Sequence, residues 1–128
     1  MSKAKSPRRV AVNEALSVGT TIRGSAQKLN LVAALIRGRR VEEAMNILAF
    51  SKRAMAVEAR KVLASAIANA ENNHNLDVDA LVVAEASVGK SITMKRFHTR
   101  GRGKSTRILK PISRLRIVVR EQAEAGEA

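Results

Sequence analysis

The 128-residue chain contains no cysteine, no tryptophan and no tyrosine, and its aromatic residues are limited to Phe50 and Phe97. Without thiols the chain has no disulfide, no Cys-based zinc site and no cysteine nucleophile, a composition that fits a reducing compartment. Hydrophobic residues still make up 45% of the chain. The core is therefore expected to be aliphatic, built from Ala, Val, Leu, Ile and Met.

Long apolar segments are also missing. No run approaches the ~20 apolar residues that a membrane-spanning helix needs, so no membrane span is expected. The N-terminus lacks the apolar centre of a secretory signal. It is basic and free of acidic residues up to Glu14, which leaves a transit peptide open as an alternative. An RNA-binding arm is favoured, because the stretch is short and not clearly amphipathic.

Negative charge is scarce. The chain has 24 Lys and Arg against 11 Asp and Glu, a formal net charge of +13. Such a chain repels itself, and a partner of opposite charge relieves the repulsion. Nucleic acid is the favoured partner, and an anionic membrane surface is the alternative. A surface charged only for solubility would have a smaller excess and more mixing of signs.

Helical periodicity occupies the first half of the chain. Ser25 is a candidate N-cap, and apolar residues at Leu29, Val32, Ala33 and Ile36 follow at helical spacing. A shorter helix is predicted over 41–48. A long helix of about 20 residues is predicted next, with Ser51 as its candidate cap and a polar run at 72–75 as its end.

The second half of the chain has the two-residue alternation of strands. Val82, Ala84, Ala86 and Val88 are predicted to share one face. Alternation over 114–119 predicts a second strand with an apolar inner face and arginines outward. The segment between them has no helical period, which leaves a floppy loop or a long hairpin. Apolar residues in register at 92, 94, 108 and 112 favour the hairpin, although a free two-stranded ribbon is only marginally stable in water.

These elements predict one α+β domain, with three helices packed on a small antiparallel sheet and a long protruding β-hairpin. Residues 1–17 are expected to form a flexible basic arm, with a short extended piece at 20–23. The domain is expected to span 18–120 and to include the hairpin at about 86–113. Residues 121–128 are expected to form a disordered acidic tail.

Candidate RNA-binding residues fall in two groups. No Asp or Glu occurs from Ala86 through Val119, and phosphates are the natural partners of a cationic run of this density. A second cluster lies at the end of the first helix, where complementing the helix dipole and contacting phosphate are equally good explanations. The candidates are Arg37, Arg39, Arg40, Lys90, Lys95, Arg96, Arg100, Arg102, Lys104, Arg107, Lys110, Arg114 and Arg116.

Two further residues in the basic run are aromatic or imidazole. Phe97 and His98 could stack on an unpaired base, a common way of recognising RNA. The alternative for Phe97 is a packing contact with the facing strand, and the sequence does not decide between the two.

Enzymatic chemistry has little support. Two Gly-Lys-Ser triplets, beginning at Gly89 and Gly103, lack the earlier glycine of a phosphate-binding loop. Asp77 and Asp79 are better explained as turn residues than as metal ligands. No catalytic residues, no metal site and no cofactor are expected.

Several short segments together resemble one family. They are residues 25–29 (SAQKL), 36–38 (IRG), 65–71 (SAIANAE), 94–96 (MKR), 101–103 (GRG), 108–110 (ILK) and 117–119 (IVV). The chain from about residue 20 to 119 closely resembles the bacterial-type ribosomal protein L twenty-two family of the large subunit. Two positions depart from the family pattern: Arg114 stands where histidine is usual, and Thr99 stands where a proline is common.

The resemblance implies a structural component of the large ribosomal subunit that binds its rRNA, supports assembly and lines the polypeptide exit tunnel with its hairpin. The implied partners are large-subunit rRNA, neighbouring large-subunit proteins and the nascent polypeptide. The implied location is on cytoplasmic ribosomes, with organellar ribosomes left open. The implied tunnel-facing end comprises Met94, Lys95, Arg96, Arg100, Gly101, Arg102, Gly103 and Lys104.

Two other classes of function compete with this one. A DNA-compacting or regulatory protein would share the basic charge but would prefer duplex DNA. A catalytic RNA-processing enzyme would need a convergent cluster of acids or histidines, which the sequence does not suggest.

Overall fold

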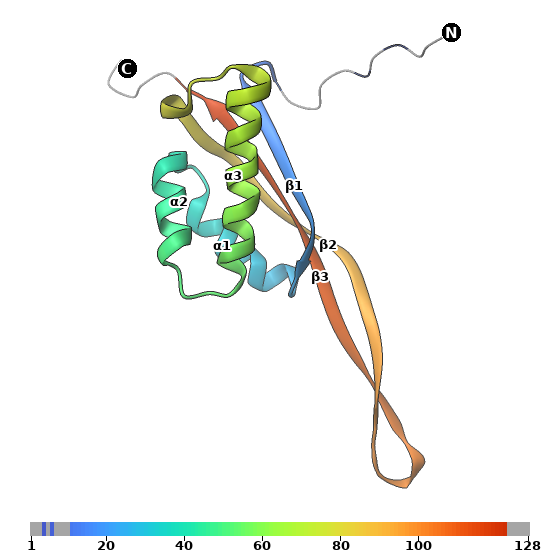
Figure 1. Cartoon of the computed structure of the whole chain (residues 1–128). Coiled ribbons are helices and arrows are strands. Elements are labelled where there is room, and N and C mark those ends of the chain that lie inside the picture. The colour runs from blue at the N-terminus through green and yellow to red at the C-terminus, as the bar shows by residue number, and fades with distance from the viewer. Residues whose placement is uncertain (1–3, 5, 7–10, 123–128) are drawn as a thin grey trace.

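The computed structural model describes residues 4, 6 and 11–122. Three helices and a three-stranded sheet form the body of the molecule, and two of the strands continue past it as a long hairpin (Figure 1). This arrangement confirms the predicted α+β class. Residues 1–3, 5 and 7–10 of the expected basic arm and residues 123–128 of the expected acidic tail lie outside the described residues.

The helices are α1 (Ala26–Ile36), α2 (Val41–Phe50) and α3 (Met55–His74). The Ser25 hydroxyl caps α1 as predicted, accepting a hydrogen bond of 3.3 Å from the Lys28 backbone N–H. The predicted cap of α3 is wrong. Ser51 instead accepts from the Arg53 N–H within the preceding loop, and Ala54 occupies the N-cap position of α3 without a side-chain bond. Ser51 therefore lies in the loop between α2 and α3, and α3 begins only at Met55.

The sheet contains β1 (Glu14–Arg23), β2 (Leu81–Thr99) and β3 (Ser105–Glu121), in the order β1-β3-β2 with antiparallel pairing throughout. A single 3₁₀ turn, η1 (Val78–Ala80), precedes β2, and another, η2 (Gly101–Gly103), lies at the hairpin tip. Because β3 is the central strand, it pairs with β1 on one side and with β2, the other strand of the hairpin, on the other side.

The core lies between the helices and one face of the sheet. Its largest fully buried side chains include Leu29, Ile36, Leu63, Leu115 and Ile117. Small residues let α3 pack close to β1: a Cβ atom added at Gly19 would lie 2.6 Å from Cγ2 of Val62. The core is aliphatic, as the composition predicts, and the face of the sheet away from the helices is left open.

Both predicted domain boundaries need correction. β1 begins at Glu14, so residues 14–17 pair with β3 rather than forming part of the arm. At the other end, Glu121 is the last residue of β3, and its carboxylate accepts a hydrogen bond of 2.9 Å from the Asp77 N–H. Pairing with β3 extends β1 back to Glu14, and pairing with Leu81 of β2 extends β3 to Glu121.

The predicted face of β2 is wrong in its first half. Leu81 and Val83 are buried, whereas Ala84 is exposed. The pairing with β3 shifts by one residue between Val83 and Glu85, which makes Ala84 a β-bulge. One extra residue moves every later side chain to the opposite face, so Ala86 points inward as predicted.

The long hairpin is present as predicted. Pairing of β2 with β3 continues from Leu81↔Glu121 to Thr99↔Ser105, with a second shift between Lys90 and Thr93. Two hydrogen bonds with Gly24, the residue after β1, hold the base of the hairpin in place. The Gly24 N–H donates to the Pro111 carbonyl at 3.1 Å, and the buried Ser113 hydroxyl donates to the Gly24 carbonyl at 2.7 Å. None of the helices among the described residues is long and apolar enough to span a membrane.

Candidate nucleic-acid interface

Among the described residues, no carboxylate forms an ion pair with a cation of the hairpin. The ion pairs in the described part of the chain use Arg39, Lys61, Arg116 and Arg120 as their cations. The hairpin cations from Lys90 to Arg114 form none of these pairs, and the sequence has no acidic residue between Glu85 and Glu121. The nine are Lys90, Lys95, Arg96, Arg100, Arg102, Lys104, Arg107, Lys110 and Arg114.

Side-chain contacts along the outer hairpin are few and local. The Arg96 Nη1 donates to the Lys95 carbonyl at 2.9 Å, and the Arg100 Nε donates to the Thr106 hydroxyl at 3.3 Å. Each of these donors keeps further N–H groups for another acceptor. The outer hairpin therefore presents an array of cations that nothing in the described chain neutralises.

The tip closes with two residues in left-handed conformation. Arg102 has φ 61° and ψ 36°, and Gly103 has φ 71°. The Arg100 N–H donates to the Lys104 carbonyl at 2.6 Å, which closes the turn. Glycine adopts this backbone conformation freely, whereas residues with a side chain, such as Arg102, adopt it rarely. The turn holds Arg102, an exposed residue, at the end of the hairpin.

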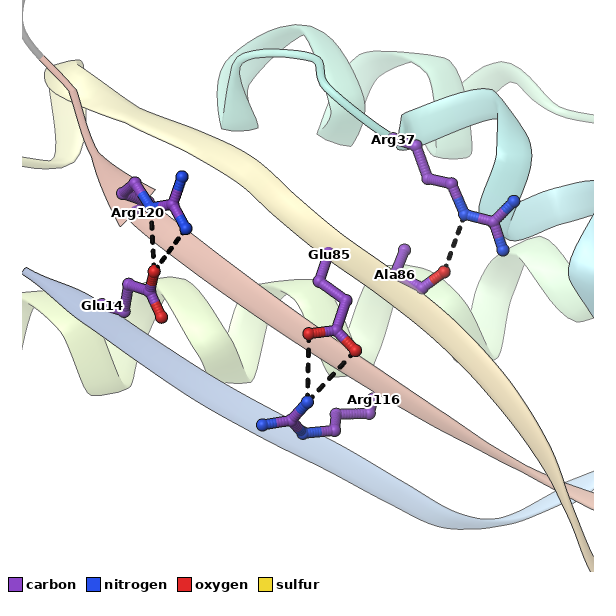
Figure 2. Close-up of polar contacts among 6 residues, drawn as sticks. All are labelled: Glu14, Arg37, Glu85, Ala86, Arg116 and Arg120. Carbon is purple, nitrogen blue, oxygen red and sulfur yellow. Dashed lines mark hydrogen bonds and ion pairs between the residues drawn. The ribbon is translucent and has the colours of Figure 1, made fainter. Parts of the chain in front are cut away.

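Two arginines of β3 are paired with acids on the open face of the sheet (Figure 2). Arg116 Nη1 donates to both carboxylate oxygens of Glu85 on β2, at 3.1 and 3.0 Å. Arg120 donates from Nε and Nη2 to one oxygen of Glu14 on β1, at 2.8 and 2.6 Å. Arg116 points outward from the sheet as predicted, but its charge is already balanced.

Arg114 differs from its neighbour Arg116. It is exposed and belongs to no ion pair of the described residues. It lines a hollow of about 420 Å³ on the open face of the sheet. The other lining residues are Leu16, Val18, Thr20, Ser87, Val88, Gly89 and Arg116. The cationic surface of the hairpin thus extends onto the sheet as far as Arg114.

The arginine cluster after α1 supports the edge of the sheet. The Gly38 N–H donates to the Val83 carbonyl at 3.0 Å, and the Val83 N–H donates to the Arg39 carbonyl at 2.8 Å. Arg37 Nε donates to the Ala86 carbonyl at 2.8 Å (Figure 2), and its Nη2 donates to Asn30. These bonds satisfy backbone groups at the outer edge of β2, a role that sequence reasoning missed because it depends on contacts between residues far apart in the chain.

The three arginines of this cluster have different surroundings. Arg39 forms a 2.8 Å ion pair with Glu43 in the first turn of α2, and Arg37 donates hydrogen bonds to Ala86 and Asn30. Arg40 is exposed and belongs to no ion pair in the described part of the chain. Arg40 is therefore the member of the cluster most open to a phosphate.

Acidic residues elsewhere have structural roles. Asp77 accepts a hydrogen bond of 3.0 Å from the Asp79 N–H and caps η1, as the turn interpretation predicts. No group of three or more His, Cys, Asp or Glu side chains suited to a metal ion occurs among the described residues.

Comparison with known proteins decides the family. Residues 17–120 match the family described as ribosomal protein L22p/L17e. The chain belongs to this family. This confirms the resemblance read from the short segments, and it makes the chain a structural, non-enzymatic ribosomal protein.

Relatives of this ribosomal protein match it over nearly its whole length. The large ribosomal subunit protein uL22 of Novosphingobium aromaticivorans is 88% identical over 125 residues, which cover 98% of this chain and 100% of the relative. The proteins of the same name from Zymomonas mobilis and Agrobacterium fabrum are 73% and 64% identical. They align over 98% and 100% of this chain and 99% of their own lengths.

Proposed function

We propose that this ribosomal protein is a constituent of the large subunit and binds large-subunit rRNA chiefly through its hairpin. The names of its relatives support the assignment to the large subunit. The observation that carries the RNA-binding part is the run of nine hairpin cations, for which the described part of the chain offers no carboxylate partner. Phosphate groups are the anions that an RNA-rich particle supplies in quantity, and both Lys and Arg bind them.

The existing contacts of each cation support a narrower set of proposed RNA contacts. The proposed phosphate-binding surface consists of Arg40 and the nine hairpin cations that form no ion pair with the described residues. Arg39 and Arg116 are set apart from it because carboxylates already balance them. Arg37 is also set apart, since its guanidinium holds the edge of β2. These three are expected to contribute less to affinity, because their guanidinium groups already have partners.

A salt titration tests this proposal. We expect the affinity of the full chain for protein-free large-subunit rRNA to fall steeply with salt, by ~0.7 to 0.9 log units per log unit of salt for each phosphate engaged. Roughly six to ten contacts would lower the affinity on the order of 10³- to 10⁵-fold between about 50 and 200 mM salt. Filter binding at a series of salt concentrations measures the slope. A nearly flat dependence would contradict binding through phosphates.

The outer end of the hairpin is proposed to line the polypeptide exit tunnel and to meet the nascent chain. Support comes from the family and from the shape of the molecule, whose η2 turn lies at the far end of the hairpin from the helices (Figure 1). Binding several rRNA segments with one long ribbon would also support assembly of the subunit. We place the protein on cytoplasmic ribosomes, in contact with neighbouring large-subunit proteins.

A single-cysteine variant tests the tunnel position. The chain has no cysteine, so Arg102→Cys introduces one thiol, at the tip. We expect a short thiol-reactive crosslinker on this residue to capture the nascent polypeptide in ribosomes that carry one. Val57→Cys is the matched control, because Val57 lies on α3 and is 57% exposed. Equal capture from both positions, or capture from neither, would contradict the proposal that the hairpin tip lies in the tunnel.

A further inference from the structure

Four consecutive rungs of the outer hairpin share one pattern. Each places an apolar side chain directly opposite a cation, and partners on one rung lie on the same face of the ribbon. The rungs are Met94↔Lys110, Lys95↔Leu109, Arg96↔Ile108 and Phe97↔Arg107. Successive rungs alternate between the two faces. Both faces therefore carry apolar and cationic groups side by side, and neither has the polar character of a surface that meets only water.

Phe97 has the largest apolar side chain in this stretch, and the residue is 77% exposed. Its cross-strand partner is Arg107, and its nearest apolar neighbour on that face is Leu109, which is itself 58% exposed. The packing explanation for Phe97 would require the facing strand to cover the ring. The structure leaves most of the ring open, so the ring is available to an external partner.

We propose that the rung of Phe97 and Arg107 binds an unpaired base of RNA. The base stacks on the Phe97 ring, while Arg107 and Lys95 on the same face hold the adjoining phosphates. The proposal rests on the proposed rRNA-binding function and identifies one nucleotide site within it.

Charge selects RNA over a protein as the occupant of this face. Lys95 and Arg107 flank the ring, and the nearest acidic residues along the two strands are Glu85 and Glu121, both in the body of the domain. A nucleotide supplies both a planar apolar surface and an adjoining anion. Unstacked bases in loops and bulges are commonly recognised by stacking on aromatic side chains.

The test compares substitutions of the two phenylalanines. Phe97→Leu is expected to weaken binding of the full chain to protein-free large-subunit rRNA about 5- to 150-fold, the range for loss of one stacked base. The slope of affinity against salt should stay unchanged, because stacking releases no counterions. Phe97→Trp should restore or exceed the original affinity. Phe50→Leu is the matched control, since Phe50 is 86% exposed at the end of α2 and should have no effect.

Other outcomes separate this inference from the function it rests on. If the unaltered chain binds rRNA with a steep salt dependence and Phe97→Leu binds equally well, the stacking site is wrong and the proposed function stands. If Phe97→Leu weakens only incorporation into complete subunits and not binding to protein-free rRNA, the ring contacts a protein and the inference is overturned. A changed salt slope in Phe97→Leu would also overturn it, because the ring would then act by positioning cations. If the unaltered chain binds rRNA without salt dependence, the proposed function itself fails.

Discussion

Replacing Leu63 with alanine is expected to lower the free energy of unfolding by about 2 to 5 kcal/mol. Leu63 lies in α3, is completely buried and belongs to the core that joins the helices to the sheet. The substitution removes apolar contacts and leaves a cavity that rigid neighbours fill only in part. Total stabilities of small domains are about 5 to 15 kcal/mol, so the loss is a large share. Urea denaturation followed by far-UV circular dichroism measures it, since the chain has no tryptophan to report by fluorescence.

Leu31→Ala is the control for the Leu63 substitution. Leu31 lies on α1 and is 50% exposed. Because solvent already covers part of this residue, the same chemical change should cost well under about 1 kcal/mol. The two variants have identical composition, and both positions are helical. If both substitutions destabilised the chain equally, the boundary between core and surface drawn for these helices would be wrong.

The fold was predictable where one element decides its own structure. The apolar spacing at Leu29, Val32, Ala33 and Ile36 is a property of α1 alone, and these four side chains are the buried ones. The hairpin followed from alternation on either side of a segment with no helical period. Its presence allowed the cation run to be interpreted as a surface rather than as a loop.

Features that depend on a partner strand were not predictable. The bulge at Ala84 arises from the register of β2 against β3, and nothing in the local alternation marks it. The position of β1 is a similar case, because the strand extends to Glu14 through pairing with the end of β3. A single inserted residue reverses the faces of a strand, so the error at Val82 and Ala84 is the expected consequence of reading one strand at a time.

The cations of the candidate site could be predicted from the sequence, but which of them already have partners within the protein could not. Arg114 and Arg116 are equivalent in the sequence, yet within the described residues only Arg116 forms an ion pair, with the carboxylate of Glu85. Arg37 likewise belongs to an arginine cluster, but its guanidinium bonds to a backbone carbonyl at residue 86. Long-range pairing determines which charges remain unbalanced, and those are the charges available to an RNA.

Neutralising four cations of the outer hairpin is expected to have the largest effect on RNA binding. The variant replaces Lys95, Arg96, Arg107 and Lys110 with glutamine, which lowers the formal net charge from +13 to +9. Loss of four phosphate contacts should reduce the salt slope by about 3 units and weaken binding on the order of 10²- to 10³-fold near 0.1 M salt. None of the four forms an ion pair among the described residues, so the fold loses no charge partner.

A control variant with the same net charge separates local contacts from overall charge. It replaces four exposed cations next to or within α3 with glutamine, Lys52, Arg53, Arg60 and Lys61, one of which forms only a 3.5 Å surface pair with Glu58. If long-range attraction alone governed binding, the two variants would lose equal affinity, because both carry +9. We expect the helix variant to keep most of the salt slope, since a counterion is released only where a cation meets a phosphate. Equal losses would mean that the hairpin cations act as bulk charge, and the ribbon would then have no special place in the interface.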